Sequence, residues 1–332
     1  MTADVHAHSL PEELLSWLRS EGPAIGIELD EGQARIAGRV STMPLRGELT
    51  DLRRRLEWMD RAGVEMQLIS NWIDLTAYAL PHDRGVVWAR RVNEALAAEA
   101  SRHPDRLRAL ATVPLQDPEA AAAELRYAAG ELGMVGVEIG TTIEGADLVT
   151  FGIGAFWEEA ARLRSIVLLH PIYPLSGLDL SAYFLHNSVG RPAETTIAIS
   201  RLVFSGVFDR YPGLRVCVVH GGGALPFLAG RLQRAYEAVP NVAARDLETP
   251  PLDAVRSLYY DTVLNSPQAL RFLIDLVEVD RVLLGSDYPF EMGDLDPVRT
   301  IRRIPGVTAE ELAMITSGNA RRLISEAEAT VP

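Results

Sequence analysis

Lysine is absent from this chain of 332 residues, so all 32 positions counted as Lys plus Arg are arginines. A chain without lysine cannot form a lysine Schiff base and cannot carry the lysine of a phosphate-binding P-loop. It also cannot make the carboxylated lysine that bridges two metal ions in many hydrolases. The composition alone therefore excludes these three chemistries.

The chain also has only one cysteine, no long apolar run and no excess of basic residues. The single cysteine, Cys217, lies in the run RVCVV, so a disulfide framework is excluded and we expect a buried side chain in a cytoplasmic protein. No stretch approaches the roughly 18 consecutive apolar residues of a membrane helix, and MTADVHAHSLPEELL lacks the pattern of a signal peptide. Acidic residues outnumber basic ones 45 to 32, a net charge of -13, which disfavours nucleic acids and anionic membranes as partners.

Short apolar runs alternate with longer segments of helical periodicity along the whole chain. Eight of these runs are typical of β-strands, at residues 3–8, 64–70, 107–114, 135–141, 165–171, 214–221, 257–263 and 281–289. Helical patterns lie between them, as the crossovers between parallel strands require. Eight such units predict an α/β fold, a (β/α)8 TIM barrel. The alternative, a doubly wound sheet, would place a glycine-rich loop after the first strand, where this chain has SLPEELL.

Residues 9–48 are too many for an ordinary connection between a strand and its helix. They include GIELDEGQARIAGRV, residues 26–40, whose alternation is typical of a hairpin. We therefore expect a small insertion after the first strand. No repeat and no linker rich in Gly, Pro or Ser divides the sequence, which predicts a single barrel domain over residues 1–332.

The ends of the predicted strands carry most of the histidines. The first strand ends in His6 and His8, the fifth in His170, the sixth in His220 and the eighth in Asp287. In a barrel the carboxyl ends of the strands form the functional face, and side chains two residues apart on a strand point the same way. Four imidazoles and one carboxylate converging there predict a divalent metal site, with Zn²⁺ the first choice and Mn²⁺ or Fe²⁺ the alternatives.

Seven motifs, in this order, resemble those of a known family: DVHAHSLP, LLHP, GRPAETTIA, VVHGGGALPFLAGR, YYDTV, GSDYPF and GNARRL. Together they span nearly the whole chain. The combination resembles the amidohydrolase superfamily, in the branch called amidohydrolase family 2. Within that branch it is most similar to the aminocarboxymuconate semialdehyde decarboxylases and related metal-dependent, non-oxidative decarboxylases.

The resemblance implies a single divalent metal ion with a bound water, held by His6, His8, His170 and Asp287. It also implies that His220 is the catalytic acid/base beside that water, with Asp287 a second member of the catalytic set. The lack of lysine agrees with a one-metal centre. A metal ion lowers the pKa of bound water and polarises substrate oxygens, while a histidine can transfer a proton at neutral pH.

Three further residues have open roles. Glu138 lies on the fourth strand, where a bridging lysine would fall, so a two-metal site held by this carboxylate is an alternative. His186 and Arg191 follow the fifth strand. His186 is a further candidate for the pocket, and Arg191 is a candidate anion contact.

Two arginines and three pocket residues bear on the substrate. Arg46 and Arg231 resemble arginines of the decarboxylase branch that contact a substrate carboxylate, Arg46 from the same chain and Arg231 from the neighbouring subunit. The resemblance therefore implies a small carboxylic acid substrate and a homodimer. Asn187 departs from the semialdehyde decarboxylases, which have a pocket tryptophan just before GRPAETT, so the resemblance does not imply their particular semialdehyde substrate. Trp72 and Phe290, after the second and eighth strands, are candidate pocket walls.

The leading prediction is thus a metal-dependent decarboxylase of a small unsaturated or aromatic carboxylic acid. A hydrolase of a lactone, ester or amide is the alternative, because the same metal-bound water could attack a carbonyl. A catalytically silent barrel that keeps its metal is a third hypothesis. The presence of His220 speaks against this third hypothesis, because that side chain is not needed to hold the metal.

Overall fold

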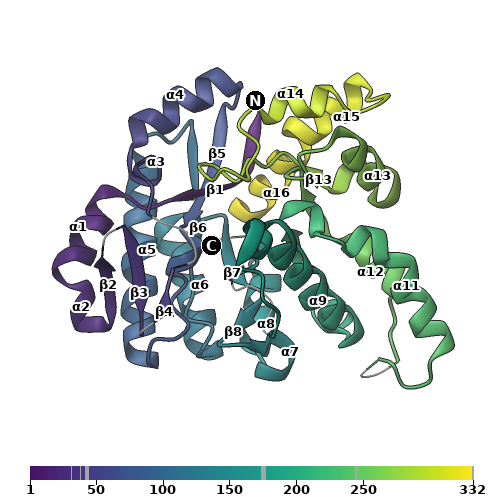
Figure 1. The fold of residues 1–332 in the computed structure, drawn as a ribbon, viewed down its shortest axis with the longest axis horizontal. Helices are drawn as coiled ribbons and strands as arrows, with labels where there is room; N and C mark the ends of the chain where they lie inside the picture. The colour runs from purple at the N-terminus through teal and green to yellow at the C-terminus, as the bar shows by residue number, and fades with distance from the viewer. Residues whose placement is uncertain (31, 38, 42–44, 173–176, 244–245, 331–332) are drawn as a thin grey trace.

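The computed structural model describes residues 1–30, 32–37, 39–41, 45–172, 177–243 and 246–330, and its centre is a sheet of eight parallel strands (Figure 1). In spatial order these strands are β1 (Ala3–Ser9), β5 (Met66–Asn71), β6 (Leu107–Ala111), β7 (Gly136–Gly140), β10 (Ile166–His170), β11 (Arg215–Val218), β12 (Tyr259–Asp261) and β13 (Val282–Leu283). The chain beyond β13 returns to β1, where His8 N–H donates to the carbonyl of Tyr288 at 2.8 Å and Ala7 bridges Tyr288 in parallel. Each predicted strand is present, and the (β/α)8 barrel is confirmed.

Helices cover the outside of the strands (Figure 1). The longer ones are α1 (Glu12–Ser20), α4 (Leu52–Ala62), α5 (His82–Ser101), α6 (Pro118–Leu132), α8 (Gly154–Arg162), α9 (Arg191–Phe204), α11 (Leu225–Ala238), α13 (Pro267–Val277) and α16 (Asn319–Glu328). Shorter ones are α2 (Gly22–Ile25), α3 (Gly47–Thr50), α7 (Leu148–Phe151), α10 (Val207–Arg210), α12 (Pro251–Ser257), α14 (Pro297–Arg302) and α15 (Ala309–Ala313). Side chains cap several helix starts: Asp117 accepts from the N–H of Ala120 at the start of α6, and Gly133 ends that helix in the left-handed conformation.

The predicted insertion lies between β1 and β5. Its hairpin forms part of a three-stranded antiparallel sheet, made of β2 (Ile27–Asp30), β3 (Gln33–Ile36) and β4 (Arg39–Val40), on the left of Figure 1. An ion pair of 2.7 Å joins Arg39 to Glu144, in the turn between the short strands β8 (Thr142–Ile143) and β9 (Ala146–Asp147). The insertion is therefore tied to the segment that follows β7.

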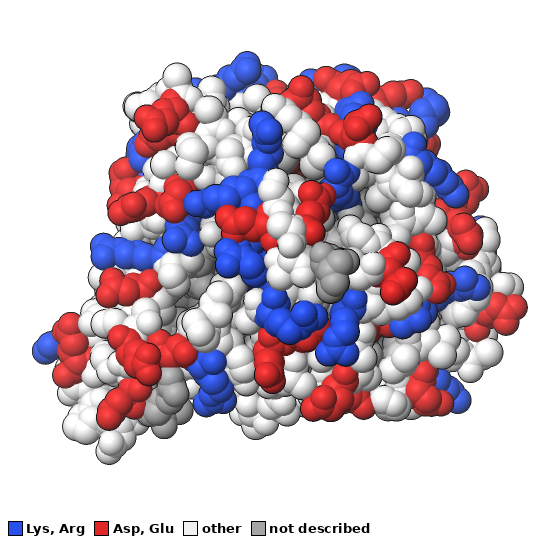
Figure 2. Space-filling model, turned by 180° about the vertical axis from the view of Figure 1, so that it is seen from behind, with Lys and Arg blue, Asp and Glu red and all other residues white. Residues whose placement is uncertain are grey.

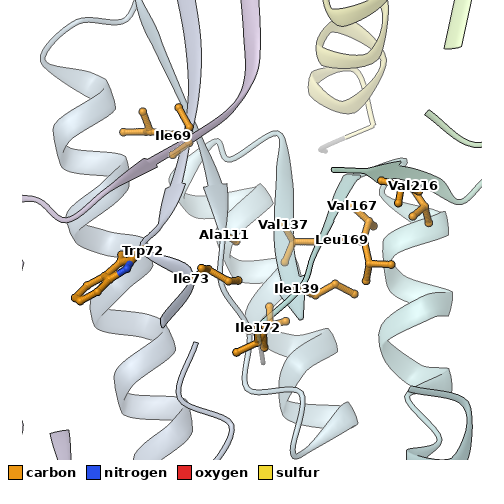
Figure 3. Close-up of a cluster of buried hydrophobic side chains, with 14 of the residues drawn as sticks. Ile69, Trp72, Ile73, Ala111, Val137, Ile139, Val167, Leu169, Ile172 and Val216 are labelled. Atoms are coloured by element: carbon orange, nitrogen blue, oxygen red, sulfur yellow. The ribbon is translucent and has the colours of Figure 1, made fainter. Parts of the chain in front are cut away.

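Alternation along the strands separates two apolar cores. Val137, Ile139, Val167 and Leu169 belong to the larger cluster, which includes the helices around the barrel, and Figure 3 shows them projecting from their strands. The intervening positions face the barrel interior, where Val5, Leu68, Leu110, Ile166, Leu168, Cys217 and Leu283 meet four side chains of α16. Cys217 is fully buried there, as predicted. The C-terminal helix thus closes one end of the barrel with apolar side chains.

The surface carries mixed charge. Figure 2 shows arginines interspersed with acidic side chains over one face of the molecule. Within the described part of the chain, no helix is both long enough and apolar enough to cross a membrane.

The packing of α16 generates a stability prediction. Leu323 is 1% exposed and lies in the interior cluster, so Leu323→Ala removes buried methyl groups and should lower the free energy of unfolding by about 2–5 kcal/mol. Arg321→Ala, an exposed change on the same helix, should cost less than about 0.5 kcal/mol. Denaturant unfolding midpoints measure both variants. Equal midpoints would contradict the role of α16 as the end of the core.

Candidate metal centre and active site

The polar site occupies the layer above the apolar interior of the barrel. On β10 the positions 166, 168 and 170 share the inner face, so His170 follows Ile166 and Leu168 inward. On β12 the same alternation brings Asp261 inward after Tyr259. These polar side chains therefore come from the last inward position of each strand.

The first strand reaches this layer through an irregularity. Val5 belongs to the interior cluster, whereas Ala7 belongs to the outer one, and the register between β1 and β5 shifts between Asp4 and Ala7. Such a shift re-aims the side chains that follow it. His6 and His8 consequently face the mouth of the barrel, both fully buried.

Two site residues have unusual backbone conformations. His220 and Asp287 follow β11 and β13 with φ of +55° and +57°, values that cost free energy in a residue with a side chain. The turn after His220 packs closely on the start of α9, because a Cβ on Gly223 would lie 2.2 Å from the carbonyl oxygen of Pro192. The surrounding structure holds both residues so that their side chains enter the site.

The nitrogens and oxygens of the site converge on one point. Asp287 Oδ1 lies 3.5 Å from Nε2 of His6 and 3.2 Å from Nε2 of His8, and candidate ligand atoms of His6, His170, His220 and Asp287 lie within 4.8 Å of one another. Ligands at about 2.1 Å from one ion, at right angles or tetrahedral, would stand about 3.0–3.4 Å apart. The spacing therefore fits a single divalent cation.

Hydrogen bonds on the other ring nitrogens orient three of these imidazoles. Nδ1 of His6 donates to Asp261 Oδ2 at 2.6 Å, Nδ1 of His8 to the carbonyl of Asn71 at 2.9 Å, and Nδ1 of His170 to the carbonyl of Pro171 at 2.9 Å. Because carbonyls and carboxylates only accept, Nδ1 carries a proton, and in the neutral ring the Nε2 lone pair points into the site. All three Nε2 atoms and Asp287 Oδ1 are buried without a hydrogen-bond partner among the described residues, as a metal-binding site requires.

Charge in the site also favours a cation. Burial opposes protonation of His6, but the carboxylates of Asp287 and Asp261 outweigh it and raise the pKa of His6 to about 9. Burial, with the neighbouring imidazoles, lowers the pKa of His170 well below its ordinary value, so this ring is neutral and can ligate. Burial tends to raise the pKa of Asp287, yet His6 and the other imidazoles hold it well below its ordinary value. The site is thus built around a positive charge beside an ionised Asp287.

His220 differs from the other three histidines. Its Nε2 lies 3.5 Å from Asp287 Oδ2, but its Nδ1 has no hydrogen-bond partner within the described residues. Its side chain is 17% exposed, whereas those of His6 and His8 are fully buried. His220 also lines the cavity described next, so this ring can contact both the metal centre and a bound molecule.

Two pockets adjoin the site and share His220 and Asn187 in their walls; we call them the inner lobe and the outer lobe. The inner lobe, about 20 Å³, is lined by Trp72, Ile73, His170, Asn187, Arg191, His220, Asp287 and Phe290. The outer lobe, about 270 Å³, is lined by Asn187, Ser188, Pro192, His220, Gly223, Val263, Leu264, Asn265 and Met292. Trp72, Phe290 and Asn187 therefore lie where pocket walls were expected. Trp72 Nε1 is buried with no hydrogen-bond partner in the described part of the chain.

Three other candidates lie away from these lobes. Arg46 is ion-paired with Glu291, the residue after Phe290, and its side chain is partly buried. Arg231 is exposed on α11, and His186 packs its ring on Phe184 with 4.7 Å between centroids. Neither lobe is lined by any of the three, as far as the described residues go.

Glu138 lies behind His8. Its Oε1 is 3.6 Å from Nδ1 of His8, the nitrogen that is already bonded to the Asn71 carbonyl, and burial raises the pKa of its carboxyl group. Glu138, His8 and His170 form a second group of possible ligands. A second ion there would compete with the hydrogen bond that orients His8, so the geometry favours one ion.

Sequence reasoning did not assign Asp261 or the network beneath the site. Asp261 also accepts the backbone N–H of Gly221 at 2.8 Å, next to His220, so one carboxylate holds two site segments. The buried Arg55 guanidinium donates to the carbonyl of His8 and to Gln67, which in turn donates to Asp4. The sequence did contain one indication of Asp261, because its carboxylate lies in the motif YYDTV near the end of a predicted strand. No local pattern marks Arg55, which lies on a helix otherwise typical of a solvated surface.

Fold and site together define a barrel with a candidate metal centre at the carboxyl ends of its strands. The chain matches the family described as amidohydrolase over residues 3–325. The 2-amino-3-carboxymuconate-6-semialdehyde decarboxylase of Dictyostelium discoideum is 31% identical over 96% of this chain and 89% of its own length. This chain therefore belongs to the amidohydrolase family, as its motifs predicted.

Solved structures resemble it over their full length. The 5-carboxyvanillate decarboxylase of Sphingomonas paucimobilis has a TM-score of 0.82 at 25% identity, covering 98% of both chains. A dihydroxybenzoic acid decarboxylase from a Polaromonas species, crystallised with manganese and the inhibitor 2-nitroresorcinol, has a TM-score of 0.77 at 25% identity, covering 98% of this chain and 97% of its own. Both are named as decarboxylases of aromatic acids.

The bond from His6 to Asp261 generates a second prediction. Asp261→Asn keeps the shape but removes the charge that orients His6, so affinity for a divalent cation should fall about 10- to 100-fold. Competition with a chelator measures the affinity, and Asp275→Asn, an exposed carboxylate on α13, is the matched control. Unchanged affinity in Asp261→Asn would remove its orienting role.

Proposed function

We propose that this protein is a metal-dependent, non-oxidative decarboxylase of a small aromatic or unsaturated carboxylic acid. The observation that carries the proposal is the convergence of three oriented Nε2 atoms and Asp287 beside His220, at the wall of a cavity. Decarboxylase relatives that align over nearly the whole chain support it. In this proposal His6, His8, His170 and Asp287 hold one divalent ion. Zn²⁺ is our first choice, although the manganese in the Polaromonas relative also supports Mn²⁺.

The reaction needs two functions from the site. A bound divalent ion would supply a positive centre that holds the substrate's oxygens and withdraws electrons. His220 would deliver a proton to the carbon that bears the carboxylate; the bond from that carbon to the carboxylate then breaks, its electron pair stays with the carbon, and CO2 leaves. The His220 side chain is 17% exposed and lines both lobes, so it can exchange a proton with a molecule bound there.

The lining of the cavity suggests the shape of the substrate. The outer lobe combines Val263, Leu264 and Met292 with the amides of Asn187 and Asn265, and its only titratable side chain among the described residues is His220. A ring with neutral substituents fits that surface better than a second carboxylate does. Trp72 also lines the inner lobe, and its N–H, which has no partner among the described residues, would donate to a substrate oxygen in this proposal.

The working unit in this proposal is a cytoplasmic homodimer of single-domain chains. Arg231 is exposed on α11, a position from which it can reach a neighbouring subunit. Arg46, close to the end of β13 through its pair with Glu291, would contact the substrate carboxylate from the same chain. Both roles follow the family resemblance and rest on planar guanidinium recognition of carboxylates.

The direct test is CO2 release. We expect the metal-loaded protein to release CO2 from at least one acid of a panel that includes 2,6-dihydroxybenzoate, 5-carboxyvanillate and muconate-type acids. His220→Asn should lower kcat by roughly 10²- to 10⁴-fold while the metal content stays near one equivalent. Turnover of lactones or esters with no CO2 from any acid would instead establish a hydrolase.

The two arginines provide a separate test. Arg46→Ala and Arg231→Ala should each raise KM for the true substrate about tenfold or more, because a charged hydrogen bond to its carboxylate is lost. Metal content should stay at the wild-type value. Arg234→Ala, an exposed change on the same helix as Arg231, is the control. Wild-type KM in both variants would remove the carboxylate assignment.

A further inference from the structure

Arg191 connects the wall of the cavity to a candidate metal ligand. It is the first residue of α9, is 5% exposed and lines the inner lobe beside His170 and Asp287. Its Nη1 donates to the carbonyl oxygen of Pro171 at 2.6 Å. The same oxygen accepts the Nδ1 proton of His170 at 2.9 Å. One carbonyl therefore joins the guanidinium to the imidazole.

The Pro171 carbonyl lies beyond the paired residues of β10. The pairing of β10 with β7 ends at His170 and Gly140, and its pairing with β11 ends at Leu169 and Val218. Within the barrel, the N–H of Thr141 holds the preceding carbonyl, that of His170. Arg191 thus secures the carbonyl that sets the rotation of the His170 ring.

Arg191 itself is held from the other side of the mouth. Its Nη2 lies 3.5 Å from Oδ1 of Asp74, in the short helix η1 (Ile73–Leu75) that follows β5, and both side chains are buried. A planar guanidinium can contact two partners in fixed directions, which an ammonium cannot do. Arg191 therefore connects the segment after β5, which contains Asp74, to the segment after β10, which contains Pro171.

We propose that Arg191 is a positioning residue for the metal centre: by fixing the Pro171 carbonyl, it orients His170 and links the substrate pocket to metal coordination. The inference rests on the proposed metal centre. The Pro171 carbonyl bonds directly to a proposed ligand, and loss of such a partner changes metal affinity by roughly 10- to 100-fold. Arg191 acts on the ion through this carbonyl. A ligand that presses on Arg191 in the inner lobe would also alter the orientation of His170.

Arg191→Met keeps the length of the side chain and removes its donors. The protein is stripped of metal, reloaded with Co²⁺ and compared with wild type by chelator competition and by its visible absorption, which reports ligand geometry. We expect the Kd for Co²⁺ to rise at least tenfold and the absorption bands to change. Arg191→Lys, which keeps the charge and one donor, should recover part of the affinity. Arg201→Met, on the same helix and paired with Asp147 at the surface, should match wild type in both measurements.

The outcomes are distinguishable. A folded Arg191→Met protein with wild-type Kd and spectrum would overturn the positioning role. If that variant does not fold, Asp74→Asn decides: we expect at least a threefold rise in Kd, and unchanged Kd would overturn the proposal. Wild-type protein that binds no Co²⁺ would contradict the proposed function itself, and this inference with it.

Discussion

The hydrogen bonds on the outer nitrogens of His6, His8 and His170 are the constraint on which the site depends. Each fixes a tautomer and a ring rotation, and together they direct three lone pairs to one place beside Asp287. The bond of His170 is local and that of His8 crosses to the neighbouring strand β5, but the bond from His6 to Asp261 joins β1 to β12, so the barrel must close before it can form. Without a cation, the buried Nε2 atoms and Asp287 Oδ1 would lose their hydration with no partner among the described residues to compensate, which costs free energy. A bound cation would supply that partner.

The barrel interior supports this arrangement by separating apolar from polar layers. The lower layer, filled by strand side chains and α16, supplies the hydrophobic stabilisation of the core. The upper layer contains charged and polar groups, and burying any of them without a partner would destabilise the fold. The positive φ values of His220 and Asp287 add backbone strain in the same layer. Successive positions of the same strands therefore supply the apolar core and the polar site, and the shift in β1 brings His6 and His8 into the upper layer.

The cavity links that centre to substrate choice. Asn187 and His220 belong to both lobes, so any molecule that extends from the metal centre toward the outer lobe passes them. A tryptophan at position 187 would fill space that the amide leaves open. Arg191 also lines the inner lobe and bonds the carbonyl of Pro171, the residue after His170, so one side chain contacts both the pocket and the end of β10.

The sequence by itself determined the eight strands, the barrel, the insertion after β1, the family and the identity of the residues at the strand ends. Alternation and strand-end position are local properties, and every barrel gathers its strand ends at one face. Tertiary structure alone decided the rest. The pairing of His6 with Asp261, the support of His170 by Arg191 and the contact of Arg55 with His8 join residues far apart in the chain. The distances between such residues are set by barrel closure and helix packing, which no local pattern encodes.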